Sequence, residues 1–100
     1  MDGELLELRF TGELWFWRGP SPFFFVIVPD EPSRAIRAVA RAATYGWGAI
    51  PVTVAIADRV WKTSIFPKDG RYLVPIRAAI RAAEGLADGD PVTMRLAIGR

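Results

Sequence analysis

The strongest constraint on the fold of this chain is that part of its sequence occurs twice. Residues 36–43 match residues 76–83 at six of eight positions. Each copy also follows a Val-Pro pair and precedes a Pro-Val-Thr run: Val28-Pro29 and residues 51–53, then Val74-Pro75 and residues 91–93. Two similar halves, approximately 6–57 and 60–98, predict one pseudo-twofold domain, because each half has to bury its apolar face against the other.

Length and composition indicate one globular domain over residues 1–100, with 51% hydrophobic and 24% charged residues. Cysteine is absent, so no disulfide forms and the cytoplasm is the expected location. The longest wholly apolar run, residues 23–28, is far shorter than the ~20 residues of a spanning helix, so no membrane partner is expected. The net charge is only +2 and acidic residues are interleaved with the basic ones, which makes nucleic acid an unlikely partner.

Hydrophobic periodicity predicts the secondary structure. Strands are expected at residues 6–17, 23–28, 50–57, 60–66, 71–74 and 92–98, and helices from Asp30 to a Gly-Trp-Gly stop at 46–48 and at about 75–84. The strand at 23–28 is apolar on both faces and must be covered twice, which a small closed barrel with flanking helices achieves. We therefore predict a mainly β fold with two short helices, a closed six-stranded barrel built as a β-β-α-β repeat.

Four segments give the chain a family resemblance. They begin with the stretch from residues 52–54 (Val-Thr-Val) through 61–67 (Trp-Lys-Thr-Ser-Ile-Phe-Pro), followed by residues 70–76 (Gly-Arg-Tyr-Leu-Val-Pro-Ile), 81–86 and 89–92. With them the chain, from about Phe10 to Ile98, resembles the bacterial domain-of-unknown-function family numbered nineteen-oh-five, which is also found fused to OmpD-associated domains. The resemblance implies a double-split β-barrel and brings no catalytic residues. One departure lies at residues 57–59, where a turn glycine is expected; either the connection is longer or Asp58 takes the left-handed conformation.

Candidate catalytic chemistry is scarce in this sequence. Histidine and cysteine are both absent, which excludes the Ser-His and Cys-His arrangements and the nitrogen and sulfur ligands of zinc. The densest acidic segment, Asp88-Gly89-Asp90, lacks the further ligands of a calcium loop and is typical of a turn. We expect no enzyme activity, no cofactor, no cofactor-binding residue, no catalytic residue and no metal site.

The arginines of the two expected helices are candidate anion contacts. Arg37 and Arg41 lie one turn apart, as do Arg77 and Arg81, so four guanidinium groups would be presented as two pairs. The alternative is that all four coat the solvated faces of amphipathic helices.

Trp15 and Trp17 are candidate contacts for a ligand or a partner. An uninterrupted period of two places both on the polar face of the first strand, beside Glu13. The alternative is a bulge at Gly12 that reverses the alternation and buries both indoles.

These observations favour a small non-enzymatic binding or interaction module that contacts either a second copy of itself or an unidentified small ligand. A nucleic-acid-binding regulator that uses the helix arginines is the alternative, and an enzyme is the least favoured class.

Overall fold

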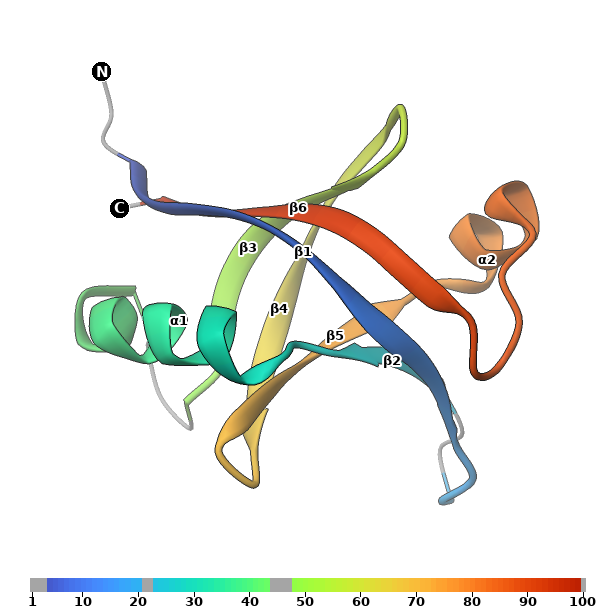
Figure 1. Cartoon of the computed structure of the whole chain (residues 1–100), viewed down its shortest axis with the longest axis horizontal. Coiled ribbons are helices and arrows are strands. Elements are labelled where there is room, and N and C mark those ends of the chain that lie inside the picture. Colours follow the sequence, from blue (N-terminus) through green and yellow to red (C-terminus); the bar gives the residue numbers. More distant parts are fainter. Residues whose placement is uncertain (1–3, 21–22, 44–47, 100) are drawn as a thin grey trace.

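The computed structural model describes residues 4–20, 23–43 and 48–99. This part of the chain forms β1 (Glu4–Trp17), β2 (Phe23–Ile27), α1 (Asp30–Ala43), β3 (Ile50–Ile56), β4 (Arg59–Lys68), β5 (Arg71–Ile76), α2 (Ala78–Glu84) and β6 (Pro91–Gly99) (Figure 1). The order of elements is the one that the periodicity predicts. Gly46 and Trp47 of the expected helix stop lie outside the described residues.

The strands close into a barrel in the order β1-β2-β5-β4-β3-β6, and every neighbouring pair is antiparallel. The predicted mainly β fold, with two helices and a closed six-stranded barrel, is therefore confirmed. β1 is long enough to serve both neighbours: Leu6 to Glu13 pair with β6, and Leu14 to Trp17 pair with β2. In Figure 1, β1 correspondingly runs along β6 first and along β2 afterwards.

The hydrophobic core fills the interior of the barrel. Along β6, Val92, Met94, Leu96 and Ile98 are at most 2% exposed, whereas the residues between them face outward. Full burial of an aliphatic side chain contributes about 1.5–3 kcal/mol, so the inward faces of the strands supply most of the stabilising burial.

Helix α1 begins directly after the Val28-Pro29 pair and buries one face against the barrel. Ser33 is fully buried, and its hydroxyl donates a 3.0 Å hydrogen bond to the carbonyl oxygen of Val28. Ile36 is also fully buried, and Val39 packs beside it at helical spacing. The helix thereby packs against β1, β3 and β5.

The second helix differs from its prediction. A helix from Pro75 to Glu84 is expected, but α2 begins at Ala78, because β5 continues to Ile76 and pairs there with Phe24 of β2. Ile76 is 4% exposed and belongs to the core as a strand residue. Within α2, Ile80 is half-buried, while Ala79 and Ala83 are exposed.

This shift changes the meaning of the sequence repeat. Ile36 is the seventh residue of α1, whereas Ile76 ends β5 before α2 begins. The matching octapeptides therefore do not occupy equivalent positions in the fold. The similarity of residues 36–43 and 76–83 reflects shared composition of two short helices and their flanks, rather than a residue-by-residue structural equivalence.

The connection between β3 and β4 is a two-residue turn made by Ala57 and Asp58, with Ile56 paired to Arg59. The residue with positive φ is Ala57, at 53°, so neither alternative is found: the connection is not longer, and Asp58 is not left-handed. An L-residue other than glycine is strained in this region by about 1–2 kcal/mol. The guanidinium of Arg95 donates a 3.3 Å hydrogen bond to the carbonyl oxygen of Ala57, which helps to hold the turn.

Candidate functional site

The outer face of the barrel is apolar where β1, β2 and β5 lie side by side. Antiparallel pairing places Trp17 opposite Phe23 and Trp15 opposite Phe25, so these four aromatic side chains share one face. The rings of Phe23 and Phe25 lie 5.4 Å apart. Next to this aromatic cluster, the pairing of Ile27 with Leu73 extends the apolar face onto β5.

The two indoles are exposed, as uninterrupted alternation predicts. Trp15 is 47% and Trp17 is 45% exposed, whereas Leu14, which precedes Trp15 in β1, is fully buried. The alternative, a bulge at Gly12, is not found, because the register with β6 is continuous from Leu6 to Glu13. The exposure of Trp15 and Trp17 therefore follows from strand geometry alone.

Gly19 helps to position the Trp17 indole. A Cβ atom on Gly19 would meet Nε1 of Trp17 and lie 2.8 Å from its Cε2, so the backbone of the bend after β1 lies directly against the ring. Only a residue without a side chain allows this approach. The indole is thus supported on one side while it remains open to solvent on the other.

Trp15, Trp17 and Phe25 line a groove of about 760 Å³. Its apolar lining consists of Trp15, Phe16, Trp17, Phe25, Ile27 and Leu73, and its charged lining consists of Arg18, Asp30, Lys68, Asp69 and Arg71. A second, smaller depression is lined by Arg9, Thr93 and Arg95 together with residues 55–57 and Met94. Of these two, only the first combines several exposed aromatic rings with charged groups at its edge. We call it the aromatic groove.

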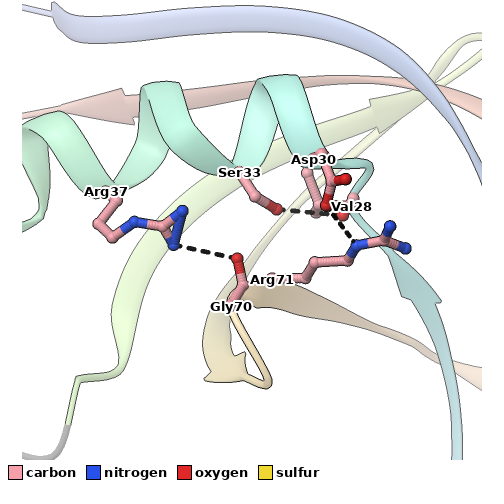
Figure 2. A network of polar contacts seen from close by, with 6 residues as sticks. All are labelled: Val28, Asp30, Ser33, Arg37, Gly70 and Arg71. Carbon is pink, nitrogen blue, oxygen red and sulfur yellow. Dashed lines mark hydrogen bonds and ion pairs between the residues drawn. The ribbon is translucent and has the colours of Figure 1, made fainter.

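A network of polar contacts fixes one edge of the aromatic groove (Figure 2). The Nε of Arg71 donates a 2.7 Å hydrogen bond to Oδ1 of Asp30 in the first turn of α1. Two turns later, Arg37 donates a 3.0 Å hydrogen bond to the carbonyl oxygen of Gly70. Figure 2 shows that both contacts join α1 to the β4–β5 turn, so they hold that turn against the helix.

This network lowers the pKa of Asp30. The hydrogen bond from Arg71 and the positive charge of Arg71 lower the pKa of Asp30, and the charges of Arg34 and Arg37 act in the same direction. The same contact raises the pKa of Arg71. The ionised pair is therefore favoured in the folded state.

This pKa shift predicts a pH-dependent stability difference. A carboxyl whose pKa is lower in the folded state stabilises the fold above its unfolded pKa, about 3.9, and loses that contribution as the pH falls through the folded pKa. Asp30→Asn should therefore be less stable than the wild type near pH 7, and the difference should shrink below about pH 4. Urea unfolding across this range measures the difference.

Glu31→Gln is the control, because it removes a carboxylate from the same turn of α1 without removing the partner of Arg71. We expect a weaker pH dependence for this variant. A stability difference for Asp30→Asn that stays constant from pH 7 to pH 3 would contradict the lowered pKa.

The structure does not bring the four helix arginines together. In Figure 1, α1 and α2 lie on opposite sides of the barrel, which separates Arg37 and Arg41 from Arg77 and Arg81. Arg37 is engaged with Gly70, and Arg41 is exposed. Arg77 is the N-cap residue of α2, and the guanidinium of Arg81 lies 3.7 Å from the ring centroid of Phe24. Each arginine has its own surroundings rather than a place in a common anion site.

The acidic segment at residues 88–90 forms a turn. Oδ1 of Asp88 accepts a 2.9 Å hydrogen bond from the backbone of Phe16, and Oδ2 of Asp90 accepts a 2.8 Å bond from Ala87. Among residues 4–20, 23–43 and 48–99, no group of three or more acidic side chains is arranged to hold a metal ion. Across the same ranges, neither helix has the length and apolar character needed to cross a membrane.

Sequence reasoning identified the two tryptophans of the aromatic groove but not its other residues. Asp30 and Arg71 are 41 positions apart in the chain, and no local sequence pattern predicts their contact. Phe25 and Leu73 are typical apolar strand residues by sequence. These residues could have been assigned to the groove only if the pairing of β2 with both β1 and β5 had been known.

A family model described as "Domain of unknown function (DUF1905)" matches residues 10–96, which is most of the chain. No curated protein matches the sequence.

Proposed function

Since the chain belongs to the DUF1905 family, a domain of unknown function, we propose a function from the site itself: the protein is a small non-enzymatic binding module whose aromatic groove takes a ring-containing apolar small molecule. The observation that carries the proposal is the pair of exposed indoles in a concave surface. Two large aromatic side chains left in water are costly, at ~25 cal/mol per Å² of apolar surface. A ligand that covers them recovers this free energy.

The dimensions and lining of the aromatic groove support a small ligand. Small-molecule sites enclose roughly 300–1,000 Å³ and are mostly apolar with a few polar groups; the groove encloses about 760 Å³. The rings of Trp15 and Trp17 offer flat surfaces for offset stacking, and Leu73 supplies an aliphatic surface beside them. This combination suits a molecule with flat rings.

The charged residues of the aromatic groove support binding rather than catalysis. Asp30 is held by Arg71, and Asp69 lies 3.9 Å from Lys68 across an exposed ion pair. The guanidinium of Arg71 lowers the pKa of Asp30, which makes this carboxyl a poor general acid. The absence of histidine and cysteine from the sequence points the same way.

The barrel order supports the finer architecture, a double-split barrel with two related halves. The first half of the chain consists of β1, β2, α1 and β3, and the second half consists of β4, β5, α2 and β6. If each strand is replaced by the corresponding strand of the other half, the cyclic order β1-β2-β5-β4-β3-β6 keeps the same neighbours. We infer that the halves correspond as whole elements, with α2 shortened relative to α1, although the matching octapeptides are out of structural register. A cytoplasmic location belongs to the same proposal, because the chain has no cysteine to oxidise.

Nucleic-acid recognition receives less support. The helix arginines lie on two sides of the barrel, and two of them are engaged with Gly70 and Phe24. A phosphate backbone needs a continuous basic track. We therefore expect oligonucleotide binding to be weak and to disappear as the salt concentration rises.

The experiment is a titration with N-phenyl-naphthylamine. This uncharged dye joins a phenyl ring to a naphthalene ring system and fluoresces when it leaves water. We expect saturable binding of one dye per chain, with a Kd on the order of micromolar, a range typical of small apolar ligands. Sedimentation at the same protein concentration serves as the control for self-association. A titration that rises linearly without saturation, or a dimer whose formation blocks the dye, would contradict the proposal.

A further inference from the structure

The charges that line the aromatic groove are unequal in number. Three cations, Arg18, Lys68 and Arg71, face two carboxylates, Asp30 and Asp69. Both carboxylates already have partners, because Asp30 lies 2.7 Å from Arg71 and Asp69 lies 3.9 Å from Lys68. The groove therefore carries one positive charge in excess.

The excess charge is located at Arg18. Within the described ranges, Arg18 forms no ion pair, and its guanidinium carbon lies 5.3 Å from the ring centroid of Phe16. Arg18 directly follows Trp17 and lines the aromatic groove, so its guanidinium lies at the tryptophan end of the groove. The ion pairs of Asp30 and Asp69 belong instead to α1 and the β4–β5 turn.

A guanidinium in this setting suits one kind of polar group. It is planar, always charged and presents paired N–H donors that match the oxygens of a carboxylate, sulfonate or phosphate. Its aromatic neighbours also exclude water from one side, which strengthens a contact with an anion relative to one in bulk solvent.

We propose that the ligand of the aromatic groove carries a single acidic group, which binds Arg18 while the apolar rings of the ligand lie against Trp15 and Trp17. This proposal rests on the proposed function, because it specifies the chemistry of the molecule bound in the same groove. A neutral ligand would leave the guanidinium uncompensated. A ligand with acidic groups along its length would bring them toward Asp30 and Asp69.

The experiment compares two dyes that share the same rings. Anilinonaphthalene sulfonate is N-phenyl-naphthylamine with one sulfonate added, so the pair isolates the acidic group. Each dye is titrated into the wild type and into Arg18→Gln. We expect Arg18→Gln to weaken binding of the sulfonate dye roughly five- to tenfold more than it weakens binding of the neutral dye, a modest factor for a charge-assisted contact because the guanidinium is exposed.

Arg41→Gln is the matched control. It removes the same charge from an exposed position of α1 that does not line the aromatic groove. We expect no change with either dye, which separates a local contact from an effect of net charge. Rising salt should weaken the sulfonate dye in the wild type but not in Arg18→Gln.

The outcomes distinguish the two proposals. If neither dye saturates the wild type, the proposed function is wrong. If both dyes saturate and Arg18→Gln leaves the affinity for the sulfonate dye unchanged, the groove binds ligands but the assignment of the acidic group is wrong. An equal loss in Arg18→Gln and Arg41→Gln also overturns the assignment, because the effect would then come from net charge.

Discussion

Gly12→Val should destabilise the protein by about 3 kcal/mol, at the upper end of the effects of overpacking a core. Gly12 lies where β1 leaves β6 and begins to pair with β2. A Cβ atom there would meet the carbonyl oxygen of Ile27 and lie 2.8 Å from Cγ1 of Val26, which is itself fully buried. The backbone and a packed core side chain cannot both move away without opening the barrel.

Thermal and urea unfolding measure this effect. For a domain of this size, a loss of about 3 kcal/mol corresponds to a fall in Tm of roughly 12–24 °C. Gly99→Val is the matched control, since Gly99 is also a strand glycine and a Cβ atom there meets nothing within 4 Å. We expect its stability to change by no more than about 0.5 kcal/mol. Equal behaviour of the two variants would show that β1 and β2 do not approach each other closely at Gly12.

The second large effect is on binding. Replacement of both Trp15 and Trp17 with serine should abolish saturable binding of N-phenyl-naphthylamine at micromolar concentrations while the barrel stays folded. Both side chains are nearly half exposed, so the loss of stability should be limited to two cross-strand aromatic contacts, about 1–2 kcal/mol in total. Dye fluorescence and urea unfolding measure the two quantities separately.

Two controls make this result specific. Trp61→Ser makes the same chemical change at a residue that packs against the core and should cost several kcal/mol. Val60→Ser removes an apolar side chain that is 63% exposed outside the aromatic groove and should change neither stability nor binding. If the double variant unfolds as Trp61→Ser does, the indoles are structural. If it folds and still binds the dye, the groove is not the binding site.

The sequence by itself determined the local structure of most of the barrel. Alternation of apolar and polar residues located the strands, and it placed Trp15 and Trp17 on the solvent side because side chains of a strand point alternately to its two faces. Helical spacing of Ile36 and Val39 located the buried face of α1. These features depend on residues close together in the chain, which is the range over which periodicity carries information.

The tertiary structure decided the features that depend on neighbouring strands. Pro75 and Ile76 have the sequence of a helix start, yet the ladder with Phe25 and Phe24 of β2 keeps them extended. In the extended conformation, the backbone of this segment pairs with β2, and the side chain of Ile76 is buried in the core. Together these two contributions stabilise the strand more than one additional helical turn would stabilise α2.

The aromatic groove depends on tertiary structure in the same way. The alternation of apolar and polar residues predicts which face of β1 a residue occupies. It does not predict which strand pairs with β1. Closure of the barrel placed Phe25 opposite Trp15, added Leu73 to the lining of the same groove and brought Arg71 to Asp30. Contacts between residues this far apart in the chain arise only when long loops are closed and the strands pair, so the two tryptophans were visible in the sequence and the groove around them was not.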